Sequence, residues 1–217
     1  MPVNMPKRAF FAFSFACPYR ADPPVIDGLL KDWDDRFRLP DLGVLEGEGA
    51  YAEVYMAWHE TGLYLALQVS RPAALAVDPR RPVRGDGLQV WIDTRDVREA
   101  HRASRYCHHF WFLPRGGGKS GKDPLAGQNR VRRARAQAKM CDPADLGVAS
   151  RVLKTGYRME VHLPAAALTG FDHEENSRLG FSYLLKDRKL GRQSWTADEP
   201  LPVSYDPSLW GALELIR

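Results

Sequence analysis

The chain has 217 residues, 44% of them hydrophobic, which is enough to bury one sizeable core and argues for a single domain over 1–217. Its 31 Lys and Arg against 27 Asp and Glu give a net charge of +4, a modest excess that comes mostly from one Arg-rich stretch and weakly favours acidic partners. Cys17, Cys107 and Cys141 have neither the even number of a disulfide framework nor the spacing of a zinc knuckle, so reduced thiols are expected.

The N-terminal segment places Lys7 and Arg8 before the apolar run AFFAFSFAC. This order has the outline of a short secretory leader, but the run is at the lower limit of length and also fits a buried strand. If the run is a strand, we expect a cytoplasmic protein. If residues 1–17 act as a leader, we expect a secreted one. No other segment approaches the roughly 20 apolar residues of a membrane span.

Alternating apolar and polar residues predict short β-strands along most of the chain. Segments 52–59 (AEVYMAWH) and 63–70 (LYLALQVS) are joined by a hairpin-length link, so they are expected to pair as antiparallel neighbours. Further strands are expected in GLQVWID, YCHHFWFL, YRMEVHL, LGFSYLLK, RQSWTA and GALELI. About ten such strands predict an all-β, antiparallel β-sandwich of the jelly-roll or immunoglobulin-like type. Helix is expected to be minor, with a turn or two at PAAAL (164–168).

The least regular stretch is a Gly- and Arg-rich insertion at about 114–147. Its glycines and prolines argue against a long element at its start, and its middle, RVRRARAQAK, suits a short basic helix. Long irregular segments in compact domains are usually functional or mobile, so this one is a candidate cover for a sheet face.

Motifs of common enzyme and nucleotide sites are incomplete. GGGKSG matches the end of a phosphate-binding loop, but the first glycine of that motif falls on Leu113 and no helix with a buried face follows. There is no HExxH, no GxSxG and no Cys–His pair at a recognisable spacing, so no enzyme is expected. Residues 130–139 have no interleaved aromatic residues, so they are interpreted as a solvated basic face rather than a nucleic-acid site.

The adjacent His108 and His109 suggest a metal site only until strand geometry is considered. Neighbouring side chains on a strand point to opposite faces, so these two imidazoles cannot bind the same ion. One of them is therefore expected in the core or at its rim.

The six tryptophans are the strongest compositional indication of function. Trp91 and Trp111 each lie on the face opposite the most apolar side of their strand, Trp91 beside Gln89 and Trp111 beside His109. An aromatic ring next to polar groups on an outer sheet face is typical of a sugar-binding platform, because the ring covers C–H patches while the polar groups bond hydroxyls. The alternative is that the insertion packs onto these rings.

Six segments between Pro23 and Ile216 together resemble the family 9 carbohydrate-binding modules. In chain order they are PPVIDGLLKDWDD, AWHETGLYLALQV, RGDGLQVWIDTRD, GYRMEVHLPAAAL, RLGFSYLLKDRKLGRQSW and DPSLWGALEL. The resemblance implies a β-sandwich, related to DOMON-type domains, that binds sugar without catalysis and carries structural calcium.

The resemblance also implies roles for individual positions. In the family, two tryptophans grip the reducing end of a glucan; here Val83 takes the first position, and the second falls near Ser204 or Tyr205. A family glutamate corresponds to Gln89, whose amide is still capable of bonding a hydroxyl. Aspartates of the family framework correspond to Asp27 and Asp86, expected in turns, and to Asp93 and Asp187, expected as calcium ligands.

We therefore expect carbohydrate binding on an outer sheet face, supplemented by C-terminal loops. The predicted sugar-binding residues are Gln89, Trp91, His109, Trp111, Trp195 and Tyr205. One alternative is an interaction or scaffold domain in which the insertion closes this face and 130–139 docks an acidic partner. Another is a DOMON-like haem or redox domain, whose axial ligands would come from Met56, Met140, His109 and His162.

Overall fold

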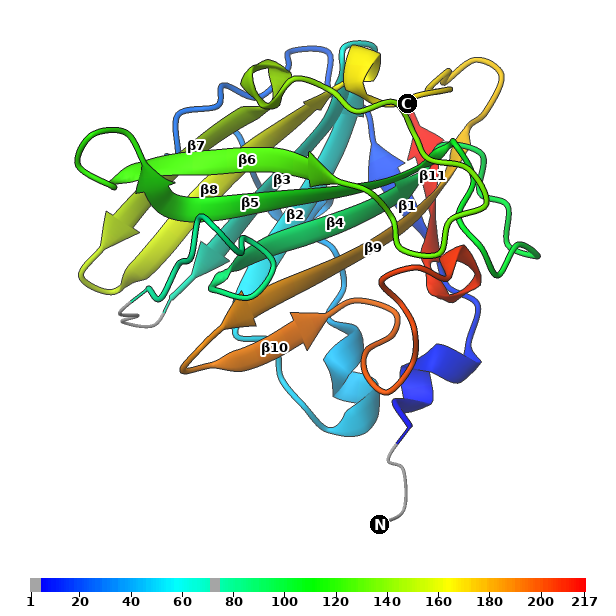
Figure 1. Cartoon of the computed structure of the whole chain (residues 1–217), viewed down its shortest axis with the longest axis horizontal. Coiled ribbons are helices and arrows are strands. Elements are labelled where there is room, and N and C mark those ends of the chain that lie inside the picture. The colour runs from blue at the N-terminus through cyan, green and yellow to red at the C-terminus, as the bar shows by residue number, and fades with distance from the viewer. Residues whose placement is uncertain (1–4, 71–74) are drawn as a thin grey trace.

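A computed structural model describes residues 5–70 and 75–217, which form two β-sheets packed face to face (Figure 1). Sheet A has the strand order β1-β11-β9-β4-β5-β6, with β10 paired to β9, and sheet B has the order β2-β3-β8-β7. The named strands pair antiparallel except β1 and β11, which are parallel. The predicted β-sandwich is therefore confirmed. The strands are β1 (Ser14–Pro18), β2 (Ala52–His59), β3 (Gly62–Val69), β4 (Gly87–Asp93), β5 (Cys107–Gly117), β6 (Asp123–Asn129), β7 (Gly147–Leu153), β8 (Gly156–Pro164), β9 (Arg178–Asp187), β10 (Gly191–Ser194) and β11 (Gly211–Ile216).

Helical structure within the described ranges is confined to short 3-10 turns. One of them, η5 (Ala165–Ala167), falls in the PAAAL segment where a turn of helix is predicted. The other turns are η1 (Lys7–Phe10), η2 (Asp35–Phe37), η3 (Leu42–Glu46), η4 (Pro143–Asp145) and η6 (Pro207–Leu209). None of the helices seen in these residues has the length and hydrophobicity that crossing a bilayer requires.

The main core fills the space between the sheets. Strand alternation sends every second side chain of each sheet into this space, where Leu65, Val90, Phe110, Met159 and Phe181 are completely buried. The N-terminal apolar run contributes less than predicted. It forms a strand only from Ser14 onward, and Phe10 and Phe11 remain exposed.

A single carboxylate holds a long N-terminal segment over the outer face of sheet B. Glu160 of β8 is fully buried and accepts backbone N–H groups from Asp27, Gly28 and Leu30. Its Oε1 also accepts the indole Nε1–H of Trp33 at 3.1 Å. These four donors come from the stretch that covers this side of β3 and β8, so the carboxylate closes the outer layer of the sandwich.

We expect Glu160→Gln to lower the free energy of unfolding by about 2 kcal/mol. The amide NH2 of glutamine cannot accept from the N–H groups that the carboxylate binds, and the charge of the acceptor is lost. Urea unfolding followed by tryptophan fluorescence measures this loss. Glu48→Gln is the matched control, since Glu48 is exposed and its carboxylate accepts no hydrogen bond from a described residue. Equal stability of the two variants would contradict the anchoring role of Glu160.

The predicted insertion is more regular at its start than expected. β5 continues to Gly117, and β6 (Asp123–Asn129) pairs with it, with a register shift between Leu113 and Gly117. The connecting turn uses Gly118 and Gly121 at φ of +66° and +65°, a backbone region that glycine enters without steric cost. The glycines therefore make a hairpin that widens sheet A (Figure 1).

The helix predicted in the middle of the insertion is absent from residues 130–142. The backbone there bonds to a side chain of the same segment and to a loop carbonyl instead of to its own preceding turn. Gln137 accepts the N–H of Val131 and donates to its carbonyl, and Arg135 N donates to Ala103 O at 2.7 Å. These bonds hold the segment as turns and extended chain against sheet A.

The adjacent histidines face opposite ways, as predicted. His108 points into the main core beside Phe110, with ring centroids 5.7 Å apart, whereas His109 faces outward from sheet A. Burial lowers the pKa of His108 to about 4. The imidazole is therefore neutral in the folded protein near pH 7.

The buried His108 makes stability fall as the pH is lowered. An unfolded histidine has a pKa of about 6.5, so between that pH and about 4 the unfolded chain binds a proton here that the folded chain does not. We expect this site to cost about 2 kcal/mol of unfolding free energy between pH 7 and pH 5. His108→Phe should lose that part of the pH dependence in urea unfolding, and the exposed His101→Gln should retain it.

Candidate functional site

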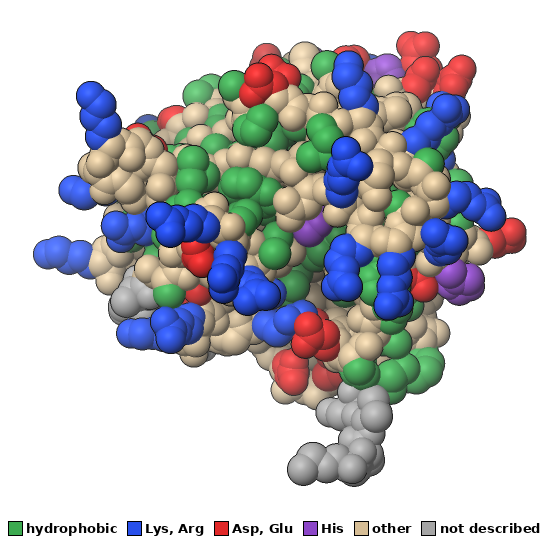
Figure 2. Space-filling model, in the orientation of Figure 1, with side chains coloured by type: hydrophobic (Ala, Val, Ile, Leu, Met, Phe, Trp, Pro, Cys, Tyr) green, Lys and Arg blue, Asp and Glu red, His purple; other side chains and the backbone are tan. Residues whose placement is uncertain are grey.

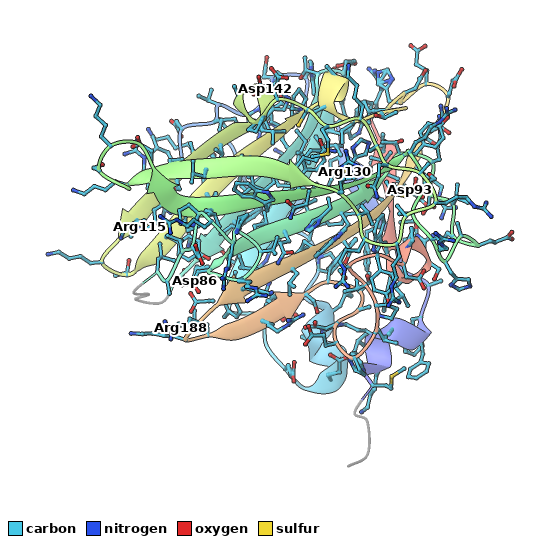
Figure 3. The ribbon with its side chains drawn as sticks, viewed as in Figure 1. Asp86, Asp93, Arg115, Arg130, Asp142 and Arg188 are labelled. Atoms are coloured by element: carbon cyan, nitrogen blue, oxygen red, sulfur yellow. The ribbon has the colours of Figure 1, made fainter. Side chains whose placement is uncertain are left out.

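A recess of about 510 Å³ opens on the outer face of sheet A, over β4, β5 and β9. Its floor is made by outward-facing strand residues, and its walls come from the segments before β4, after β6 and after β10. In Figure 3, Arg130 lies beside this face, where the chain leaves β6. Three of the six predicted sugar-binding residues line the recess, namely Gln89, Trp91 and His109.

Trp91 forms the closed part of the floor. Its ring stacks on that of His109, with centroids 4.6 Å apart and planes at 12°. Only 1% of Trp91 is exposed, because it packs in a second hydrophobic core on this outer face. That core also contains Ala103, Cys107, Val131, Leu184, Ala197, Val203 and Trp210. Trp91 therefore supports the recess but offers no free face for stacking against a ligand.

Gln89 and His109 form a polar pair on the same floor. The imidazole Nε2 and Gln89 Oε1 are 3.1 Å apart, and since a carbonyl oxygen only accepts, the proton resides on Nε2. Burial, and secondarily the nearby charge of Lys186, lowers the pKa of His109 to about 3. The ring is thus neutral near pH 7, and its Nδ1 is an acceptor with no hydrogen bond to any described residue. A hydroxyl group is the complementary donor.

Val83 O fixes the amide of Gln89 and a cation at the same time. It accepts from Gln89 Nε2 at 3.5 Å, a weak bond, and from Lys186 Nζ at 2.9 Å. Gln89 therefore has a second N–H, and Lys186 has two further N–H groups, for a ligand. Donors and an acceptor meet in one partly enclosed space, which suits a ligand rich in hydroxyl groups.

Trp111 lies beside the recess rather than in its lining. It is the cross-strand neighbour of Gln89 and is only partly buried. Its indole covers Gly127 of β6 so closely that a Cβ at that glycine would lie 2.3 Å from Cζ2. The absent side chain at Gly127 lets the ring lie close against β6, while part of the ring stays exposed.

The two residues predicted from the C-terminal loops lie elsewhere. Trp195 is completely buried in the main core, where it packs against Phe15 and Phe181. It has no surface for a ligand, so we exclude it from the site. Tyr205 lies next to the second core, and its ring is covered by the guanidinium of Arg133, 5.0 Å from the ring centroid.

The two aspartates expected as calcium ligands lie far apart. Asp93 pairs with Gly180 at one end of β9, whereas Asp187 follows Lys186 at the other end, so about seven residues, or roughly 23 Å, separate them. Asp93 already accepts the N–H groups of Arg95 and Val97. Within the ranges that the structure describes, no three His, Cys, Asp or Glu side chains gather as a metal site.

Three of the four framework aspartates, Asp27, Asp93 and Asp187, act in turns. Asp187 Oδ1 accepts the N–H groups of Lys189 and Leu190, and Asp27 Oδ1 accepts that of Leu29. Asp86 accepts from Ala76 and Arg188 and thereby ties two loops to the start of β4. The turn role predicted for Asp27 is confirmed, and the same role is found for Asp93 and Asp187, whereas Asp86 joins distant loops instead of capping its own turn.

Backbone donors occupy both oxygens of Asp93 and Oδ1 of Asp187, and in the described ranges neither carboxylate is joined by two further acidic, His or Cys side chains, so neither fits a calcium ion. We expect excess EDTA to change the melting temperature by less than about 2 °C relative to buffer with calcium. Differential scanning calorimetry measures the shift. A larger drop, reversed by calcium but not by magnesium, would show that these turns need the ion.

The ligands considered for a haem are not brought together. Met56 is buried in the core between the sheets, Met140 is exposed, and His109 lies on the outer face of sheet A. His162 stacks on Tyr64 on the outer face of sheet B, with ring centroids 4.3 Å apart. An axial pair cannot be assembled from groups so distributed.

The walls of the recess were not predicted from the sequence. Several are charged side chains from segments that approach only in the folded chain: Arg84, Arg130, Arg132, Lys186, Arg192 and Glu199. One usable signal was present, since alternation along LGFSYLLKD places Leu184 and Lys186 on the outer face. The sequence had indicated only a solvated basic surface for 130–139.

The fold and the recess together define a class of protein, a β-sandwich module with a recess on the outer face of one sheet. Residues 31–217 match the family described as "Carbohydrate family 9 binding domain-like". The chain therefore belongs to this family of carbohydrate-binding, non-catalytic modules. A comparison with curated proteins found no match.

Two solved structures share the fold. One is a family 9 carbohydrate-binding module from Caldicellulosiruptor kristjanssonii in complex with cellotriose, with a TM-score of 0.62, 17% identity and coverage of 93% of each chain. The other is a family 9 module from the same organism in complex with glucose, with a TM-score of 0.59, 16% identity and coverage of 95% of this chain and 96% of the other. At these identities the likeness concerns the fold alone.

Proposed function

We propose that this protein binds a carbohydrate in the recess over β4, β5 and β9. The observation that carries the proposal is the Gln89–His109 pair, a buried and mutually bonded polar pair on the floor of a partly enclosed space. Neutral amide and imidazole groups in such a space bond hydroxyls with little cost of reorganisation. Membership of the carbohydrate-binding family supports the same conclusion.

The roles of the individual groups follow from the hydrogen-bond donors and acceptors that they have not yet used. His109 Nδ1 accepts one hydroxyl proton, and the second N–H of Gln89 donates to a neighbouring oxygen. Trp111, two strand positions from His109 on the same face, covers the apolar side of an adjoining sugar ring. Leu184 and Val203 supply apolar walls. Binding, not bond cleavage, is the chemistry that these groups support.

A scaffold role with the sheet face fully closed receives less support. Val131 from the insertion and Val203 from the C-terminal region do cover Trp91. The cover is incomplete, however, because the recess above Gln89 and His109 stays open. The covering segments thus shape a site rather than remove one.

Gln89→Leu should weaken binding about tenfold, because it removes a donor and leaves His109 Nε2 without its acceptor. Isothermal titration calorimetry with cellotriose measures this change, and a glycan array extends the comparison to other sugars. Gln68→Leu is the matched control, since Gln68 lies on β3 and bonds Arg158 outside the recess. Equal affinity of both variants and the parent protein would contradict the assignment.

Trp111→Ala should also weaken binding, by about tenfold, while Trp111→Phe should retain most of the affinity, because a flat ring remains over Gly127. The same titrations apply, with circular dichroism to verify the fold. If alanine and phenylalanine behave alike and both match the parent protein, Trp111 takes no part in binding.

A further inference from the structure

We propose that the ligand of this recess is an acidic saccharide, one that carries a carboxylate or a sulfate on a sugar ring. The inference rests on the proposed function and narrows it to a class of sugar. It is drawn from the charge around the recess, which the hydroxyl-bonding floor does not explain. Figure 2 shows Lys and Arg side chains gathered on both sides of the middle of this face.

The lining of the recess is strongly unbalanced in charge. Its cations are Arg84, Arg130, Arg132, Lys186 and Arg192, and its one acid is Glu199. Arg192 is neutralised, since it forms ion pairs with Asp198 and Glu199. Across residues 5–70 and 75–217, no carboxylate lies within ion-pair distance of Arg84, Arg130 or Arg132.

These cations come from opposite sides of the recess. Arg130 and Arg132 follow β6 at one edge of sheet A, and Lys186 belongs to β9, with β4 and β5 in between. Arg84 approaches from the turn before β4. Like charges converge here from separate segments, which costs free energy unless an anion lies between them. A single basic run exposed to solvent would not require that explanation.

Lys186 carries the clearest sign of an unsatisfied charge. Burial, followed by the neighbouring charge of Arg192, lowers the pKa of Lys186. Its Nζ is held by Val83 O at 2.9 Å, so the ammonium is fixed at the recess with two donors left. An oxyanion that accepts hydrogen bonds from those two N–H groups would replace the hydration that the buried ammonium loses.

The recess also continues beyond one sugar. Arg84, Lys186 and Arg192 line a second recess of about 500 Å³ toward Asp86 and Arg188, so they stand between the two spaces. A chain of two or three rings can occupy both, with its acidic group at the cations in the middle. Two adjoining recesses of this size suit a short oligosaccharide better than a polynucleotide, which needs a longer continuous groove.

The test compares three trisaccharides that differ at C6 alone: cellotriose, its C6 carboxylate and its C6 sulfate. In calorimetric titrations at about 50 mM NaCl, we expect at least one acidic form to bind about tenfold more tightly than cellotriose. This advantage should shrink several-fold at about 500 mM NaCl, whereas cellotriose affinity should stay constant. The carboxylate and sulfate arms distinguish the two sources of the charge.

Each other outcome has a defined meaning. Equal or tighter binding of cellotriose overturns the acidic-saccharide inference and leaves the proposed function intact. If none of the three trisaccharides binds, both fail. If inorganic sulfate alone, or an oligothymidylate, binds as tightly as the acidic sugars, the recess recognises an anion and not a saccharide, and the inference is overturned.

A double variant, Arg130→Gln with Arg132→Gln, tests the residues directly. Both side chains are at the surface, and we expect about a tenfold loss of affinity for the preferred acidic trisaccharide with cellotriose affinity unchanged. Lys119→Gln with Lys122→Gln is the matched control, because it removes the same charge from the β5–β6 turn. Equal losses in both double variants would reduce the effect to net charge and overturn the assignment.

Discussion

The register of β4 between β5 and β9 is the constraint on which the recess depends. β4 pairs with both neighbours along its length, so Gln89 and Trp91 lie in one row with Trp111 and His109 on one side and Leu184 and Ser182 on the other. A slip of one residue would send this whole row into the main core and bring Leu88, Val90 and Ile92 to the outer face. The apolar side of β4 therefore fixes the position of its polar side.

Sheet A is unusual in burying both of its faces, and this shapes the binding surface. Every residue of β4 is buried, although its alternating apolar and polar residues are typical of a strand with one face exposed to solvent. The second core around Trp91 and Trp210 covers part of the outer face and leaves the Gln89–His109 pair at its margin. The second core thus supports the floor of the recess, on which the Gln89–His109 pair lies. The walls above that floor are basic.

The sequence predicted the architecture well because strand alternation is a local property. The 52–59 and 62–69 hairpin, the opposite orientations of His108 and His109, and the turn at 165–167 all follow from neighbouring residues. The site was only half accessible to the same reasoning. Trp195 was predicted to supplement the site from a C-terminal loop, but tertiary packing places it in the main core. The basic walls of the recess could not be predicted from the sequence, because residues 84, 130–132 and 186 come together only in the folded chain.

The parallel pairing of β1 with β11 has a consequence for how this protein is made. Ser14 to Pro18 find their partners at Ala212 to Ile216, almost at the other end of the chain. A contact of such long sequence separation is among the slowest to form, because β11 is synthesised long after β1. The N-terminal edge of sheet A therefore stays unpaired until β11 has been synthesised, which leaves the exposed Phe10 and Phe11 close to an unprotected strand in the nascent chain.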